Sequence, residues 1–98
     1  MGRTLQVQSE AQRDIEAAAL WYEHQRPGLG VRFVRELDEL LERVAERPQQ
    51  FPIVEESVHR GLLGRFPYAI YFVAEETRVT LLAVLHQHRS PEIWRGRL

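Results

Sequence analysis

The hydrophobic pattern changes its period near residue 9. Across residues 4–8, apolar Leu5 and Val7 alternate with polar neighbours, which predicts a short, half-buried strand at a sheet edge. From residue 9 to about residue 25, apolar positions recur every three or four residues, which predicts a helix. Ser9 and Gln12 have the spacing of a capping box at its start. The stripe of this helix consists of Ala11, Ile15, Ala18 and Tyr22.

A second helix follows a break at residues 27–30. The break reads Pro-Gly-Leu-Gly, and proline cannot donate the amide that a continuing helix needs. Helical spacing resumes at Val31 and ends at Arg47, because Pro48 disfavours a helical residue before it. Two helices joined by so short a connection predict an antiparallel hairpin. The second stripe consists of Phe33, Val34, Leu37, Leu40, Leu41 and Val44.

The carboxyl half predicts three strands, at residues 58–64, 68–74 and 78–88. A loop at residues 48–52 precedes them, with Phe51 expected to hold it against the core. Residues 75–77 form a plausible hairpin turn, and strands joined so tightly pair antiparallel. The order β-α-α-β-β-β predicts an α+β fold in which a helical hairpin packs on one face of an antiparallel sheet. With 98 residues and no change in composition, we expect one domain over 1–98.

The last two predicted strands are apolar on both faces. In strand 68–74, Tyr68, Ile70 and Phe72 oppose Ala69, Tyr71 and Val73. In strand 78–88, Val79, Leu81, Ala83 and Leu85 oppose Leu82 and Val84. One helical hairpin covers one face, and each large side chain that finds other cover contributes about 1.5–3 kcal/mol. Two explanations stay open: the tail around Trp94 closes the second face, or a bound partner does.

Composition restricts the chemistry. The chain has no cysteine, which excludes disulfides, thiolate metal sites and cysteine nucleophiles, and suits a reducing cytosol. The start lacks the apolar segment of a secretory signal, and no apolar run approaches the roughly 18 residues of a membrane span. We therefore expect a soluble, cytoplasmic protein that does not contact membranes.

Charge is distributed unevenly. Residues 10–56 hold 6 Arg against 11 Asp and Glu, a net of −5, whereas residues 57–98 hold 6 Arg against 3 Glu, a net of +3. The total of −1 argues against an obligate nucleic-acid binder, and we expect no sequence-specific binding of nucleic acid. All 13 basic residues are arginine, which suits carboxylate or phosphate contacts but which a GC-rich genome explains equally well.

Several segments resemble ParE-type toxins of the RelE/ParE superfamily, also known as plasmid stabilisation system toxins. In the amino half these are Trp-Tyr-Glu at 21–23, the break at 27–30 followed by Arg32 and Phe33, and Pro48 with Phe51-Pro52. The carboxyl half resembles the family more closely, in RGLLGRFPYAIYF at 60–72 and AVLHQHRSPEIW at 83–94. Each block alone is weak, and their order over nearly the whole chain is fairly specific.

The resemblance implies a toxin encoded beside an antitoxin, with which it forms a hetero-oligomer. The antitoxin is usually a small protein with a DNA-binding amino domain and a flexible carboxyl segment that wraps the toxin's sheet and helix pair. ParE-like members are associated with DNA gyrase inhibition through protein binding, so the resemblance implies a binder more than an enzyme. RelE-like members cleave mRNA on the ribosome, using basic residues on the sheet and often a late tyrosine. This chain has no lysine, and its last tyrosine is Tyr71.

A nuclease hypothesis rests on one cluster of residues. Arg60, Arg65 and Arg89 could hold a phosphate while His86 or His88 transfers protons near neutral pH. The alternative for Arg60 and Arg65 is a solvated strand edge or a contact with antitoxin carboxylates. His86 and His88 share a face if the strand continues, but only Glu92 is a nearby acid, so we expect no metal and no cofactor.

The remaining candidates are aromatic or acidic. Trp21 is a predicted partner contact, whereas Tyr22 continues the core stripe. His86 is expected to hydrogen-bond the turn that begins at Ser90, and Trp94 could be either a core residue or an interface residue. The acidic residues of the second helix (Glu36, Asp38, Glu39, Glu42, Glu46) predict a solvated face paired with Arg35 and Arg43. The full predicted partner-binding set is Arg60, Arg65, Tyr71, His86, Arg89, Trp94 and Trp21.

The sequence thus favours a ParE-like toxin that inhibits DNA gyrase and is neutralised by its antitoxin. Two alternatives stay open: a ribosome-dependent mRNA endoribonuclease, and a non-toxic interaction module with the same fold.

Overall fold

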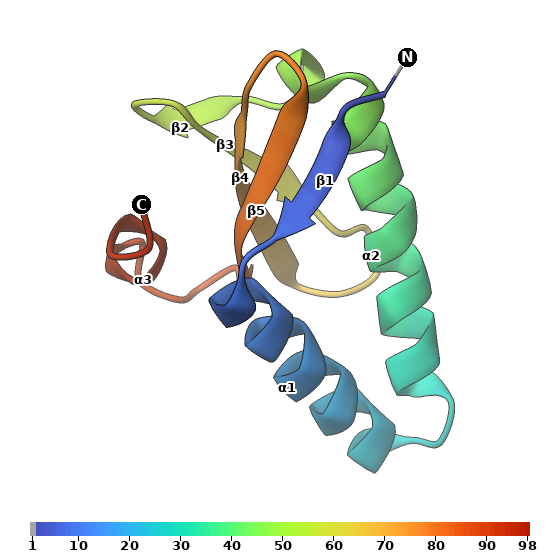
Figure 1. Cartoon of the computed structure of the whole chain (residues 1–98). Helices are drawn as coiled ribbons and strands as arrows, with labels where there is room; N and C mark the ends of the chain where they lie inside the picture. Colours follow the sequence, from blue (N-terminus) through green and yellow to red (C-terminus); the bar gives the residue numbers. More distant parts are fainter. Residues whose placement is uncertain (1) are drawn as a thin grey trace.

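A computed structural model describes residues 2–98 and confirms the predicted α+β class: two helices in a V pack on one face of a five-stranded sheet (Figure 1). The elements are β1 (Thr4–Val7), α1 (Ser9–Gln25), α2 (Leu29–Glu46), the 3-10 helix η1 (Pro48–Gln50), β2 (Ile53–Glu55), β3 (Val58–Leu62), β4 (Tyr68–Ala74), β5 (Arg78–His86) and α3 (Glu92–Arg95). In the part of the chain that the structure describes, no helix combines the length and the apolar character needed to cross a membrane.

The helical hairpin forms as predicted, but the caps of both helices and the bounds of α2 differ from the prediction. Gly28 adopts the left-handed conformation (φ 90°) that glycine accepts without strain, so α2 begins at Leu29 instead of Val31, and it ends one residue before Arg47. The Glu23 carboxylate accepts the Gly28 and Gly30 amides at 2.9–3.1 Å and satisfies the free end of α2. The predicted capping box is wrong, because the Ser9 hydroxyl bonds Glu10 and the Gln12 amide bonds Glu16.

The sheet has the order β1-β5-β4-β3-β2, with β1 at an edge as predicted. β1 runs parallel to β5, whereas the other neighbours are antiparallel, so the sheet is mostly antiparallel. Strand 68–74 has the predicted bounds, but β3 ends at Leu62 instead of Gly64 and β5 ends at His86 instead of His88. β2 was not predicted, because its three residues are too few to show a period.

The main core lies between the hairpin and the sheet. Both predicted helical stripes face it, with Ile15, Tyr22 and Val34 only partly buried. Phe51 packs against this core, its ring centroid 5.7 Å from that of Phe72, as expected for the loop that it holds. The fully buried side chains of the core include Phe33, Leu37, Leu40, Val44, Ile70, Phe72, Val79 and Leu81.

A β-bulge in β5 corrects the predicted face assignment. Tyr71 pairs with Ala83 but Phe72 pairs with Leu81, so Leu82 is an extra residue in the ladder. An extra residue shifts the alternation by one, because side chains alternate with period two. Ala83 and Leu85 therefore lie on the face opposite Val79 and Leu81, and not on the same face as predicted.

The carboxyl-terminal tail closes the second face of the sheet. Trp94, on the short helix α3, is 3% exposed and lies in a second core with side chains from β3, β4 and β5. Figure 1 shows α3 on the side of the sheet away from α1 and α2. Of the two explanations for the doubly apolar strands, the tail is the one observed over the second core, and Leu62, which pairs with Ala69 on this face, stays 50% exposed. The second core consists of Val58, Ala69, Tyr71, Leu82, Ala83, Leu85 and Trp94.

Candidate functional site

The predicted site residues lie in three separate places. Arg60, Tyr71 and Trp94 lie on the second face of the sheet. Arg65 lines a cavity between α2 and the β3–β4 loop. His86, Arg89 and Trp21 line a cleft between α1 and the end of β5. The three arginines of the nuclease hypothesis therefore do not share one cavity.

On the second face, aromatic rings stack between two guanidinium groups. The rings of Tyr71 and Trp94 are 5.3 Å apart and 17° from parallel. The Arg60 guanidinium lies 5.8 Å from the Tyr71 ring centre and donates from Nε to the Tyr71 hydroxyl at 3.2 Å. Arg95 lies 5.6 Å from the Trp94 ring centre and pairs with Glu55. Because Tyr71 and Trp94 are both buried, a partner reaches them only by displacing α3.

The cleft at the end of β5 is lined by one of the two histidines, His86, and by Tyr22 and Tyr68, and His88 lies next to His86. The rings of His86 and His88 are 5.3 Å apart, and the His88 amide donates to His86 Nδ1 at 3.2 Å. The strand ends at His86, so the two imidazoles do not share a strand face as predicted. His86 bonds the turn through its carbonyl, which accepts the Arg89 amide, and not through Ser90. Among residues 2–98 there is no group of three or more His, Cys, Asp or Glu side chains that could hold a metal ion.

Two phenols in this region are shielded from water. Burial raises the pKa of Tyr22, and the neighbouring Tyr68 adds to that effect. Burial also raises the pKa of Tyr68, with Arg89 acting against the increase and Asp14 adding to it. Tyr22 lines both the cleft and the neighbouring cavity, and its ring contacts those of Phe66 and Tyr68. Both hydroxyls are therefore neutral hydrogen-bonding groups near neutral pH.

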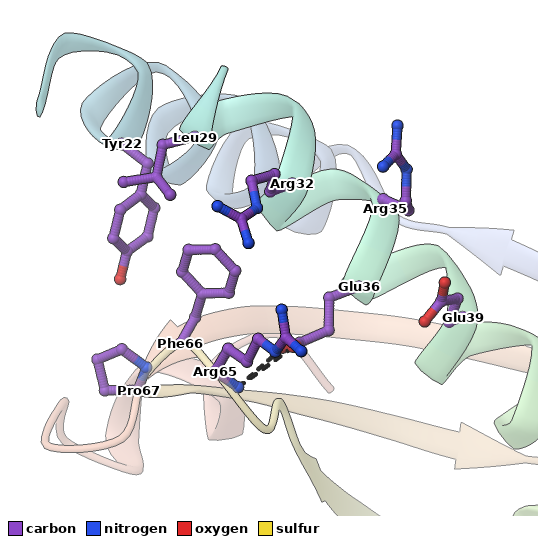
Figure 2. Close-up of a pocket in the computed structure, with 9 residues that line it drawn as sticks. All are labelled: Tyr22, Leu29, Arg32, Arg35, Glu36, Glu39, Arg65, Phe66 and Pro67. Atoms are coloured by element: carbon purple, nitrogen blue, oxygen red, sulfur yellow. Dashed lines mark hydrogen bonds between the residues drawn. The ribbon is translucent and has the colours of Figure 1, made fainter. Parts of the chain in front are cut away.

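The cavity beside α2 has a volume of about 620 Å³ (Figure 2). Figure 2 shows Arg32 reaching down from α2 toward the ring of Phe66, and Tyr22 and Pro67 at one end. The Arg65 backbone amide donates to both oxygens of Glu36 at 3.1–3.2 Å, which fixes the β3–β4 loop to α2. The predicted pairs of the acidic face with Arg35 and Arg43 are wrong, since residues 2–98 contain no such ion pair.

The outer face of the hairpin carries an apolar groove that the sequence reasoning missed. Leu20 and Val31 are 58% and 60% exposed, and with Ala19 and Val34 they form its floor. The sequence does indicate this groove, because Leu20 and Val31 are apolar but lie outside the two helical stripes that face the core. Trp21, which is 57% exposed, stands beside Leu20 and agrees with its predicted exposure. The charged residues of the groove are Glu23, Arg35, Asp38, Glu39 and Glu42.

Two solved structures have a fold similar to that of this chain. The chain resembles the "Chromosomal ParDE TA system from P. aeruginosa" with a TM-score of 0.76 and 18% identity, covering 86% of this chain and 95% of the other. It also resembles the toxin–antitoxin complex RelBE2 from Mycobacterium tuberculosis with a TM-score of 0.59 and 17% identity, covering 88% and 99%. No curated protein sequence matches.

The chain therefore shares its fold, a helical hairpin on a mostly antiparallel sheet, with both of these solved structures. The model of the family described as "ParE toxin of type II toxin-antitoxin system, parDE" matches residues 5–91. The chain belongs to this ParE toxin family, and the family resemblance found in its sequence is confirmed.

Proposed function

We propose that the chain is the toxin of a two-protein system and that a cognate antitoxin neutralises it by covering the outer groove of the helical hairpin. The observation that carries this proposal is the exposed floor of that groove, with Leu20 and Val31. Contiguous apolar surface of this kind marks protein interfaces on soluble domains. The two similar structures are described as toxin–antitoxin assemblies, which supports an antitoxin as the occupant.

The charges of the groove indicate the chemistry of the segment that fills it. Four carboxylates and one guanidinium surround the apolar floor. An amphipathic helix with apolar residues at spacings of three and four would fill the floor, and basic residues at its margins would complement the rim. The antitoxin is therefore expected to carry a segment of this type in its carboxyl part.

The test is binding of the protein encoded by an adjacent small reading frame. Leu20→Glu and Val31→Glu each place a charge on the floor, and we expect the dissociation constant measured by calorimetry to rise at least roughly tenfold. Ile53→Glu is the control, because Ile53 is equally exposed but lies on β2, away from the groove. Unchanged binding by both groove variants, or equal weakening by Ile53→Glu, would contradict this assignment.

For the cellular target we propose DNA gyrase, inhibited through protein contacts made by the basic carboxyl half. Membership of the ParE family supports this target, and so does the distribution of Arg60, Arg65 and Arg89 over three places. Purified toxin added to gyrase should reduce supercoiling or cause DNA cleavage. If neither occurs, gyrase is not the target.

A ribosome-dependent mRNA endoribonuclease is the second candidate. It is supported by the 5.3 Å approach of the His86 and His88 rings, with Arg89 next in sequence. Changing both histidines to alanine should abolish growth arrest if the chain cleaves mRNA, and should leave growth arrest unchanged if it acts on gyrase. Normal growth during induced expression of the unaltered chain would instead indicate a non-toxic interaction module.

A further inference from the structure

The cavity of Figure 2 is lined by two arginines, Arg32 and Arg65, that form no ion pair within the described part of the chain. Within residues 2–98, the guanidinium groups of Arg32 and Arg65 take part in no ion pair and no hydrogen bond. Glu36 is engaged by the Arg65 backbone amide, so its carboxylate already has a partner. A guanidinium presents a rigid fork of donors that matches a carboxylate or a phosphate.

The charge balance of the lining sets the charge of the ligand. Arg32, Arg35 and Arg65 supply three positive charges, whereas Glu36 and Glu39 supply two negative charges. The surplus is one positive charge, which complements one anionic group. A polyanion is disfavoured, because the acidic face of α2 continues beyond the cavity with Glu42 and Glu46. This argues for a carboxylate rather than a nucleic-acid backbone.

The walls set the shape of the ligand. Phe66, 8% exposed, is held edge-on between Tyr22 at 4.7 Å and Phe33 at 5.2 Å, measured between ring centroids. Tyr22, Leu29 and Pro67 complete an apolar end, so the site joins a flat hydrophobic wall to two free guanidinium groups. Because the rings are packed before any ligand arrives, binding does not have to order them. The volume of about 620 Å³ lies within the range of small-ligand and side-chain sites.

We propose that this cavity binds a single carboxylate carried next to an aromatic or aliphatic side chain of a partner polypeptide. Arg32 and Arg65 hold the carboxylate from the two sides of the cavity, one from α2 and the other from the β3–β4 loop. The apolar side chain lies against Phe66 and Tyr22. The identification of this polypeptide as the antitoxin rests on the proposed function, and it has structural support because Arg35 and Glu39 line both this cavity and the outer groove.

The site is tested on the full chain alone with N-acetyl-L-phenylalanine, which carries one carboxylate on an aromatic residue. Proton–nitrogen correlation spectra should show saturable shifts at the Arg65 and Phe66 amides, with a dissociation constant on the order of 1–10 mM for so small a probe. N-acetyl-L-phenylalaninamide, which lacks the charge, should not bind measurably. Arg32→Gln and Arg65→Gln should each weaken binding at least roughly tenfold, the loss expected for one charge-assisted hydrogen bond.

Arg43→Gln is the matched control, because Arg43 lies on the same helix and its removal changes net charge equally, but it does not line the cavity. It should leave binding unchanged. Equal binding of the amide, or equal weakening by Arg43→Gln, would overturn the proposal. Phenyl phosphate binding more tightly than the carboxylate would also overturn it, in favour of a phosphate ligand. All three arginines are exposed, so thermal melting should show that the variants remain folded.

A second measurement separates this proposal from the proposed function. If the neighbouring protein binds the chain but is insensitive to Arg32→Gln and Arg65→Gln, the antitoxin is not the source of the carboxylate and that part of the proposal fails. If the neighbouring protein does not bind at all while the acid probe behaves as expected, the cavity stands and the proposed antitoxin does not.

Discussion

Asp14 on α1 and Arg97 in the tail form a partly buried ion pair at the edge of β5. Arg97 Nη2 donates to Asp14 Oδ1 at 3.2 Å, and the two side chains are 16% and 14% exposed. Asp14 also accepts the Val84 amide at 3.0 Å, and Arg97 donates to the Leu82 carbonyl at 3.1 Å. β1 ends at Val7, opposite Leu81, so these two side chains satisfy the backbone groups of β5 that a longer β1 would have bonded.

Replacing Asp14 should therefore lower stability more than an ordinary surface change. Asp14→Ala leaves the Val84 amide without an acceptor and Arg97 without its counterion, and we expect a loss of about 2–3 kcal/mol in the free energy of unfolding. Denaturant titration measures this. Glu75→Ala is the control, because the Glu75–Arg78 pair is 56% and 50% exposed and should contribute at most about 1 kcal/mol. Equal effects would mean that Asp14 does not satisfy the edge of β5.

Trp94 should contribute strongly to stability, because it fills the second core. Trp94→Ala is expected to cost about 3–5 kcal/mol, as large-to-small changes of buried aromatics do. Trp94→Phe keeps a ring against Tyr71 and removes the buried Nε1–H group, which has no hydrogen-bond partner among residues 2–98, so it should cost less than about 1.5 kcal/mol. The two variants are compared by denaturant titration followed by circular dichroism. A harmless Trp94→Ala would show that α3 does not hold the second face closed.

Gly30 should tolerate no side chain, because the backbone of α1 leaves no room for one. An added Cβ would lie 2.5 Å from the Ala19 carbonyl oxygen and 3.1 Å from the Glu23 carboxylate, so the helices would have to separate. We expect Gly30→Ala to lower the free energy of unfolding by about 2 kcal/mol, the usual cost of overpacking. Gly64→Ala has nothing nearer than Glu36 Oε1 at 4.0 Å and serves as the control. Wild-type stability of Gly30→Ala would disprove the close approach.

Alkaline pH should destabilise the chain through Tyr22 and Tyr68. Burial raises the pKa of both phenols in the folded state above the ordinary value of 10.0, so folding favours their neutral forms. Their contribution to stability is fully present below the unfolded pKa near 10 and is lost as pH rises through the raised folded pKa. Unfolding titrations from pH 9 to pH 12 should fall less steeply for the double variant Tyr22→Phe and Tyr68→Phe. Identical pH dependence would refute this.

The hydrophobic period predicted the helices well because their buried faces have strict spacing. Residues 9–25 follow it without interruption, and η1 begins at Pro48, where the second helix was expected to end. The ends were predicted less well, because the Gly28 amide is bonded by the Glu23 side chain, and spacing alone does not reveal a partner five residues away. Similarly, nothing in an alternating pattern marks Leu82 as the extra residue, since residues 81–85 are all apolar.

The sequence predicted the exposure of individual candidate residues better than it predicted which of them lie together in the fold. The exposure of Trp21 and the packing of Tyr22 against the core followed from the helical stripe, although Tyr22 is only partly buried. The separation of Arg60, Arg65 and Arg89 did not follow, because it depends on which side of the sheet each strand end and loop reaches. The free guanidinium of Arg32 was missed for the same reason: its cavity forms only when the β3–β4 loop packs on α2.

The pairing of β1 with β5 also determines when the sheet can form during synthesis of the chain. Arg3 bonds the Glu75 carbonyl across 72 residues, and Asp14 bonds the Val84 amide across 70. The first strand has no strand partner among the described residues until the fifth has been synthesised. Such distant contacts form late, because chain entropy must be lost before they are gained. The sheet of this chain therefore closes only after residue 86 of 98 has been synthesised, and until then the apolar side chains that β1 and β5 bury lack part of their cover.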